Sequence, residues 1–161
     1  MELSIRPAVP ADRTELAAML HEVAAHFAAM AGGELDTLRN WDDLERCADL
    51  CFADPPWCTT LIAKDAGRPI GYLAYTFGVY EIFPALHVAG LYVRAEARGK
   101  GVGKALMAEV QRMAAERGAT HTDWMVWRKN DPALAFYRGL GATIYDDDVM
   151  MVMPVAAGPS S

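Results

Sequence analysis

The stretch Arg98-Gly99-Lys100-Gly101-Val102-Gly103-Lys104 decides the fold of this chain, because three glycines alternate with basic and apolar residues. An apolar run, residues 86–93, precedes it, and a helical pattern, residues 102–117, follows it. The sequence therefore predicts a strand, a tight glycine turn and the start of a helix. Glycine lets the backbone approach a ligand closely, and the N–H groups at a helix start favour a phosphate. We interpret the stretch as an anion-binding turn for a pyrophosphate.

Two better-known phosphate-binding turns do not fit these residues. A P-loop needs glycine five residues before Gly103 and serine or threonine after Lys104, whereas this chain has Arg98 and Ala105 there. The dinucleotide fingerprint needs a third glycine three residues after the second, and no glycine pair in the turn is followed by one at that spacing. What remains is a third pattern, Arg-Gly-x-Gly-x-Gly at the start of a helix.

A second motif lies downstream of the turn. Asn130-Asp131-Pro132-Ala133 is followed by Phe136-Tyr137, two further residues and Leu140-Gly141. Together with the glycine turn, this order and spacing resembles the GCN5-related N-acetyltransferase (GNAT) family, most strongly over residues 91–142. The resemblance implies an α/β GNAT fold, in which helices flank a mixed central sheet and two parallel strands splay apart to admit the cosubstrate.

The other elements follow in the order β-α-α-β-β-β-α-β-α-β-β, as one N-acetyltransferase domain over residues 2–155 with a disordered tail at 156–161. Periodicity and turn residues predict them. The expected strands are residues 3–6, 59–64, 70–79, 86–93 and 122–127, and a terminal hairpin of 142–145 and 149–153. The expected helices run from Pro10 to the Gly32-Gly33 pair and over residues 41–51, 102–117 and 131–139, the last capped by Asp131.

Composition narrows the classes of function. The chain has 161 residues, a net charge of −6 and three cysteines, which favours one domain with one core. The negative charge argues against general nucleic-acid binding, and the cysteines form no secreted disulfide framework, so buried reduced thiols and no metal site are expected. No signal peptide and no bilayer-spanning apolar run is recognised. We therefore expect a cytoplasmic protein that binds neither nucleic acid nor membrane.

The resemblance also implies the cosubstrate, acetyl-coenzyme A (acetyl-CoA), and its binding residues. The pyrophosphate would lie against the N–H groups of the glycine turn, and the pantetheine arm would pair with the preceding strand and meet an asparagine and a tyrosine. An N–H of that strand would polarise the thioester carbonyl, as oxyanion donors do. The residues are Leu91, Tyr92, Val93, Arg98, Gly99, Lys100, Gly101, Val102, Gly103, Lys104, Asn130 and Tyr137.

Two residues are candidate catalytic groups. Tyr137 lies in the short helix that family members direct at the thioester sulfur, and a phenol can give a proton to a departing thiolate. The amine must lose a proton before attack, yet this chain has Ala89 and Gly90 where many relatives carry an acid. His87 lies on the same strand, on the face expected for Ala89, and histidine can act as a base near neutral pH. The alternatives for the base are Tyr80, Glu81 and a water chain.

The expected acceptor is a small cationic primary amine. Acids gather before the second strand, and an acidic surface attracts cations, although a solvated helix face would have the same composition. They are Glu34, Asp36, Asp42, Asp43, Glu45, Asp49 and Asp54, against Arg39 and Arg46. The aromatic residues of 72–80 and the Phe-Tyr segment are similar to the diamine (polyamine) acetyltransferase branch. Peptide N-termini, lysine side chains and antibiotic amines remain open as acceptors.

Two other functions compete with an amine acetyltransferase. A non-catalytic acyl-CoA-binding or sensing domain is favoured by the missing strand acid, whereas Tyr137 and the intact glycine turn favour the enzyme. A toxin-like acetyltransferase acting on tRNA would need a basic face, against which the net charge of −6 speaks. The resemblance further implies a homodimer, for which the apolar residues 149–153 are a candidate interface.

Overall fold

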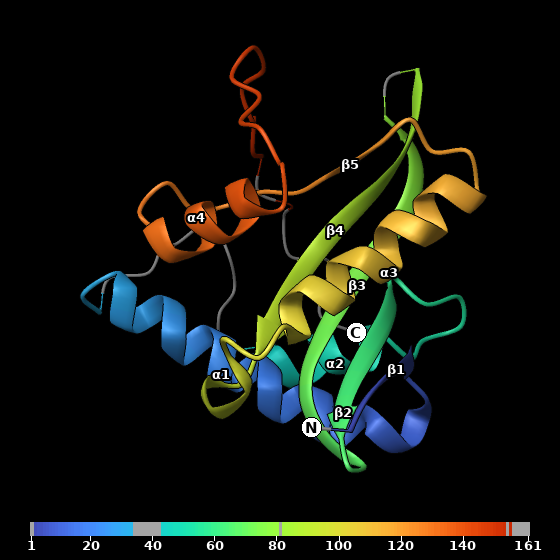
Figure 1. The fold of residues 1–161 in the computed structure, drawn as a ribbon, viewed down its shortest axis with the longest axis vertical. Coiled ribbons are helices and arrows are strands. Elements are labelled where there is room, and N and C mark those ends of the chain that lie inside the picture. The colour runs from blue at the N-terminus through green and yellow to red at the C-terminus, as the bar shows by residue number, and fades with distance from the viewer. Residues whose placement is uncertain (1, 34–42, 81, 154, 156–161) are drawn as a thin grey trace.

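The computed structural model describes residues 2–33, 43–80, 82–153 and 155, and within them five strands form one sheet (Figure 1). The strand order is β1-β2-β3-β4-β5; the first four strands pair antiparallel, and β4 and β5 pair in parallel. The strands are β1 Leu3–Pro7, β2 Thr59–Asp65, β3 Arg68–Tyr80, β4 Phe83–Val93 and β5 His121–Asp123. The helices are η1 Pro10–Asp12, α1 Arg13–Met30, α2 Leu44–Leu50, η2 Ala95–Ala97, α3 Val102–Glu116 and α4 Asp131–Gly139. This mixed sheet between helices confirms the predicted α/β class.

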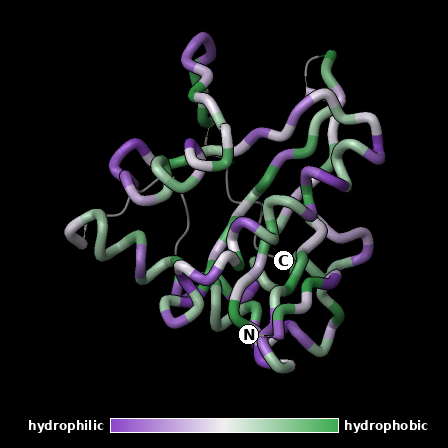
Figure 2. The backbone as a smooth tube through the Cα atoms, viewed as in Figure 1, coloured by the Kyte–Doolittle hydropathy of each residue, from purple (hydrophilic) through white to green (hydrophobic). Residues whose placement is uncertain are grey.

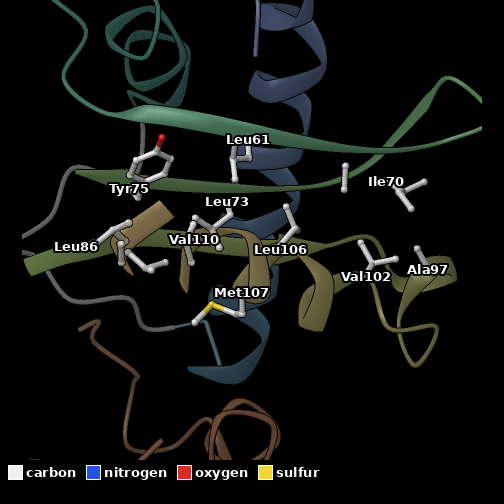
Figure 3. Close-up of a cluster of buried hydrophobic side chains, with 13 residues drawn as sticks. Leu61, Ile70, Leu73, Tyr75, Leu86, Ala97, Val102, Leu106, Met107 and Val110 are labelled. Carbon is white, nitrogen blue, oxygen red and sulfur yellow. The ribbon is translucent and has the colours of Figure 1, made fainter. Parts of the chain in front are cut away.

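The larger hydrophobic core lies between the sheet and α3 (Figure 3). Val102, Leu106 and Val110 recur at helical spacing on α3, and none is more than 1% exposed. Leu73 and Leu86 from the central strands belong to the same cluster. The apolar side chains that recur with the helical period on α3 thus pack against those that recur at every second residue on one face of the sheet.

A second core lies on the opposite face, under α1. Leu16 and Met19 of α1 pack against Ile62, Tyr72 and Ala74 of the sheet. In Figure 1, α3 crosses in front of the sheet and α1 lies behind it, so the domain has three layers. Figure 2 shows hydrophobic residues along the central strands between these helices.

β4 contains a bulge at Ala89. Ala74 of β3 pairs with Gly90 while the next residue, Tyr75, pairs with Val88, so Ala89 has no partner of its own. A bulge inserts one residue and shifts the alternation of side chains beyond it. His87 therefore shares the α1 side of the sheet with Gly90, and the strict alternation expected from the sequence is wrong beyond Val88.

β5 is shorter than predicted, ending at Asp123 instead of at residue 127. The following side chains pack onto helices rather than extending the sheet. The Trp124 ring lies 4.8 Å from that of Tyr137 on α4, and the Trp127 ring lies 6.3 Å from that of Phe27 on α1. These contacts direct the chain away from β4 and towards α4 (Figure 1).

The predicted terminal hairpin is wrong for the residues that the structure describes. Residues 142–153 contain no strand, and apolar side chains such as Val149 and Met151 are 81% and 87% exposed. An isolated hairpin is only marginally stable unless it joins a larger sheet, and the edge strand β5 offers only three residues for that pairing. The tail at 156–161 lies outside the described residues.

The α2 region also differs from the expectation. The helix starts at Leu44, Trp41 lies outside the described residues, and the buried side chain is Ala48 rather than Cys47. Cys47 is exposed, whereas the free thiols of Cys51 and Cys58 are half-buried with their sulfurs 3.5 Å apart. The expectation of buried thiols is therefore wrong for Cys47.

Asp12 ties together β1, β2 and the start of α1. Its side chain is only 5% exposed, and its two oxygens accept hydrogen bonds from Arg6 at 2.7 and 2.9 Å. Lys64 Nζ and the Val9 N–H each donate at 2.9 Å. The Arg6 hydrogen bonds, followed by those from Val9 and Lys64, outweigh desolvation and hold the pKa of Asp12 well below its usual range.

We predict that Asp12→Asn destabilises the fold by about 3 kcal/mol, because Arg6 and Lys64 lose the counter-charge that the buried carboxylate supplies. The depressed pKa fixes the pH dependence: the contribution is fully present above the unfolded pKa of about 3.9 and is lost as pH falls through the lower folded value. Urea unfolding from pH 7 to pH 2 should therefore show the difference between the two proteins shrinking at acid pH.

The matched control is Asp49→Asn, whose carboxylate is 63% exposed beside Arg13. An exposed pair contributes little, so this variant should lose less than about 1 kcal/mol. Equal stabilities of wild type and Asp12→Asn at pH 7 would contradict the assignment.

Candidate active site

β4 and β5 run side by side only at their beginnings and then part. Ala85 pairs with His121, Leu86 with Thr122 and His87 with Asp123, which is the last pair. β4 continues to Val93, so beyond His87 its edge has no strand partner among the described residues. An extended ligand can use these backbone groups as a further strand would.

The residues predicted to pair with the pantetheine arm lie on this open length of β4. The side chains of Leu91 and Val93 pack against the α3 core. Tyr92 instead points to the α1 side, where its hydroxyl donates to Glu22 at 3.0 Å. All three side chains are thus used by the protein, which leaves the backbone as the part that a ligand can contact.

The glycine turn connects η2 to α3 just past the end of β4. Gly99 and Gly101 have φ angles of 71° and 84°, a region that strains residues with a side chain. Gly101 caps α3, and its carbonyl accepts from the Ala105 N–H at 2.9 Å. The N–H groups of residues 102–104 form the first turn of α3, where no helical carbonyl can accept from them. They can therefore bind an anion, which the helix dipole favours.

The basic side chains around the turn do not act alike. Arg98 donates to the Val93 carbonyl at 2.9 Å and lies over the Tyr92 ring, 5.6 Å from its centre. Lys100 and Lys104 make no salt bridge within the part of the chain that the structure describes. These three cations surround the turn and complement an anionic ligand.

Arg94, which directly follows β4, has its partners away from the turn. Its side chain is 12% exposed and lies 3.0 Å from Glu22 and 3.3 Å from Glu15 on α1. It also donates to the Pro69 carbonyl at 2.9 Å. Arg94 therefore fastens α1 to the sheet instead of contributing to the turn.

Gly103 allows α4 to pack closely on the first turn of α3. A Cβ at this position would lie 3.2 and 3.5 Å from two atoms of the Phe136 ring. The neighbouring Tyr137 ring lies 5.0 Å from that of Phe136 and 4.8 Å from that of Trp124. The glycine turn and the Phe-Tyr motif, far apart in the sequence, are thus in direct contact.

Among the candidate site residues, Tyr137 has the pKa that is shifted furthest from its ordinary value. Burial alone raises its pKa to about 12, so the phenol stays protonated throughout the neutral range. Its hydroxyl has no hydrogen-bond partner among the described residues. It can therefore donate a hydrogen bond or a proton to a ligand.

Asn130, predicted to contact the cosubstrate arm, caps α4. Its Oδ1 accepts from the Ala133 N–H at 3.2 Å. The sequence assigned this cap to Asp131, one residue later, and that assignment is wrong. The cap uses one lone pair of the oxygen, so the side-chain NH₂ group and the second lone pair of Asn130 are left for a ligand.

The structure brings together a pair that sequence reasoning missed. His87 Nδ1 lies 2.5 Å from Asp123 Oδ1, at the last register pair before β4 and β5 part. The Tyr80 ring, from β3, lies 6.0 Å from the His87 ring. Strand register, which the sequence does not reveal, is the only signal that joins residues 87 and 123. Of the other base candidates, Glu81 lies outside the described residues.

The acidic surface expected near the acceptor is largely neutralised where the structure describes it. Arg13 binds both Glu45 and Asp49, and Arg46 lies 3.5 Å from Asp43. Asp54 is exposed and makes no salt bridge with another described residue, and the remaining members of that group, Glu34, Asp36, Arg39 and Asp42, lie outside the described residues. The described part of this surface is therefore less acidic than the residue count suggests.

The described residues contain neither a membrane-spanning helix nor a metal-binding cluster. No helix there is long and apolar enough to cross a membrane. No three His, Cys, Asp or Glu side chains there are grouped so that they could hold a metal ion.

Comparison with known proteins bears on the family. A family model described as the acetyltransferase (GNAT) family matches residues 20–142. Thialysine N-epsilon-acetyltransferase of Caenorhabditis elegans is 28% identical over 131 residues, which cover 80% of this chain and 75% of that protein. The residues matched by the family model include the glycine turn and the Phe-Tyr motif, which carry the site geometry above.

Solved structures agree on the fold. A possible acetyltransferase from Clostridium difficile 630 superposes with a TM-score of 0.78 at 19% identity, covering 96% of this chain and 99% of that one. Ribosomal-protein-alanine N-acetyltransferase from Brucella melitensis biovar Abortus 2308 superposes with a TM-score of 0.70 at 20% identity, covering 96% and 99%. Since the family model spans most of the chain and its motifs meet at one site, the chain belongs to the GNAT acetyltransferase family.

Proposed function

We propose that this protein transfers the acetyl group of acetyl-CoA to a primary amine, with a small cationic amine as the acceptor and residues 2–155 as the catalytic domain. The observation that carries the proposal is the continuity of the open β4 edge with the anion-binding turn. Acetyl-CoA has a matching shape, because an extended amide-containing arm is joined to a pyrophosphate. Backbone groups of residues 91–93 suit the arm, and the N–H groups of residues 98–104 suit the pyrophosphate.

The chain supplies two candidate catalytic groups for the direct attack of an amine on a thioester. Acetyl-CoA supplies the activated acetyl group. His87 takes a proton from the ammonium group, and the neutral amine then attacks the carbonyl carbon. Tyr137 donates to the sulfur as the carbon–sulfur bond breaks. A phenol whose pKa is raised to about 12 is always protonated when it is needed, and a positioned acid of this kind accelerates reactions about 10²–10⁴-fold.

The acceptor class is supported by two observations. The relative from Caenorhabditis elegans is named for the acetylation of thialysine, an amine. The net charge of −6 favours the approach of cations over that of anions. Protein amines remain the alternative acceptors, and a homodimer and a cytoplasmic location stay predictions of the family resemblance.

We predict that free thiol is released from acetyl-CoA in the presence of a cationic small amine. The assay follows thiol release with polyamines, thialysine and lysine, aminoglycosides and lysine-containing peptides at equal concentration. Turnover with the first two groups well above the peptide rate would support the proposed acceptor class. Turnover with peptides alone would move the acceptor to proteins.

The second candidate function is a non-catalytic acyl-CoA sensor. The observation that favours it is the absence of any acidic residue between Phe83 and Val93 of β4. Acetyl-CoA binding in the micromolar range, combined with no thiol release for any amine, would favour this sensor over the enzyme. The His87–Asp123 pair argues for the enzyme, because it restores a proton acceptor near the missing acid.

A further inference from the structure

We propose that Asp123 is the positioning residue for the general base of the acetyl transfer. Its carboxylate accepts a hydrogen bond from His87 Nδ1–H and so holds the ring with Nε2 ready to take a proton from the amine. The pair is joined at 2.5 Å. This inference rests on the proposed function, because it names how the base of that same site is held.

The position of the pair is what connects it to the reaction. His87 and Asp123 face each other in the last register pair of β4 and β5, and beyond them the open edge of β4 begins. The pair therefore marks the closed end of the gap into which an extended arm would insert. β4 has no carboxylate of its own, so β5 supplies one by strand pairing.

The hydrogen bond fixes which nitrogen of the imidazole is the base. A carboxylate can only accept, so Nδ1 must carry the hydrogen. In the neutral ring the lone pair then lies on Nε2. When Nε2 takes a proton, the negative charge of Asp123 stabilises the imidazolium. One carboxylate thus sets the tautomer of the imidazole and holds its orientation.

Neighbouring elements contribute few other groups to the pair. From β3, the Tyr80 ring lies beside the imidazole, and the Tyr80 hydroxyl is 3.2 Å from Thr76 Oγ1. From β5, His121 Nε2 lies 3.5 Å from Asp123 Oδ2. The His87 and Asp123 side chains are 26% and 40% exposed. The pair is thus shielded enough to persist and open enough to pass a proton to water.

The proton balance of the step is as follows. The acceptor arrives as an ammonium ion and gives one proton to His87 Nε2, which passes it to water. The amine nitrogen forms a bond to the carbonyl carbon and loses its second proton to the same Nε2. The carbon–sulfur bond breaks, and the leaving thiolate takes the proton of the Tyr137 hydroxyl. His87 then gives the second proton to water and the Tyr137 phenolate takes one proton from water, so both side chains return to their starting states. The products are the amide, the free thiol and one proton released to solvent.

The test compares wild type, Asp123→Asn, Asp123→Glu and His87→Gln in two measurements. Nitrogen-15 NMR of the imidazoles reports the tautomer of His87 without any substrate, and thiol release gives kcat and KM from pH 5 to pH 10. We expect the Nδ1–H tautomer in wild type and its loss in Asp123→Asn. We expect kcat of that variant to fall at least about tenfold and the KM for acetyl-CoA to stay unchanged. Asp123→Glu should recover part of kcat.

The control is His121→Gln, which removes the other imidazole near Asp123 and should leave the tautomer of His87 and kcat unchanged. An Asp123→Asn variant with the wild-type tautomer or the wild-type kcat would overturn the inference, and so would a His87→Gln variant with full kcat. If wild type releases no thiol with any amine, the proposed function fails, and the catalytic role of Asp123 fails with it. In that case the tautomer of His87, measured by NMR, still shows whether the His87–Asp123 hydrogen bond forms.

Discussion

Tyr137→Phe is expected to lose about 10²–10⁴ in kcat while binding acetyl-CoA as wild type does. The change removes one oxygen and keeps the ring, which packs against Phe136 and Trp124, so the fold should be preserved. The loss falls on kcat because the hydroxyl acts on the sulfur only as that atom leaves. Steady-state thiol release and calorimetric binding of acetyl-CoA separate the two effects.

The raised pKa of Tyr137 also predicts how the rate depends on pH. A phenol with a pKa of about 12 does not ionise below pH 10, so an alkaline limb in that range must come from another group. Tyr145→Phe is the matched control, because the Tyr145 side chain is 72% exposed in the C-terminal segment. Full kcat in Tyr137→Phe, with Tyr145→Phe also normal, would show that Tyr137 is not the acid.

Gly103→Val should lower kcat by about two orders of magnitude. A side chain here meets the Phe136 ring, since even its Cβ would lie 3.2 Å from the ring, and α4 must move outward with Tyr137. A displacement of about 1 Å at a reacting group can cost about 10²-fold in rate, and overpacking costs about 1–3 kcal/mol in stability. Thiol release and thermal unfolding measure these two effects.

Gly139→Val is the matched control for that substitution. Gly139 is the last residue of α4, and a Cβ there would meet nothing within 4 Å. Its rate and stability should remain within about 0.5 kcal/mol of wild type, as for other surface changes. If Gly103→Val also behaves as wild type, the close packing of α3 on α4 does not position Tyr137.

The sequence predicted correctly those elements whose boundaries are marked by their own residues. The start of α3 at Val102 and the extent of α4 agree with the structure, because glycine, proline and apolar spacing mark them within a few residues. β5 failed for the opposite reason. Trp124 and Trp127 look like strand residues in sequence, but their rings pack onto α4 and α1, a tertiary effect that overrides β-propensity.

The candidate site divides in the same way. Gly101, Gly103 and Tyr137 could be found because they lie in two compact motifs. Asp123 could not, because its role depends on the β4–β5 register and on the bulge at Ala89. Neither the register nor the bulge can be recognised from the composition of the sequence or from the spacing of its residues. The carboxylate partner of the candidate base is therefore the part of the site that only the three-dimensional structure reveals.

A crystal structure of the complex with coenzyme A tests the central claim most directly. The account predicts that the pyrophosphate contacts the N–H groups of residues 98–104 and that the pantetheine arm runs along the open edge of β4 beside residues 91–93. It also predicts that the thiol ends between Tyr137 and the His87–Asp123 pair. A coenzyme bound anywhere else on the protein, or no bound coenzyme at saturating concentration, would contradict the account.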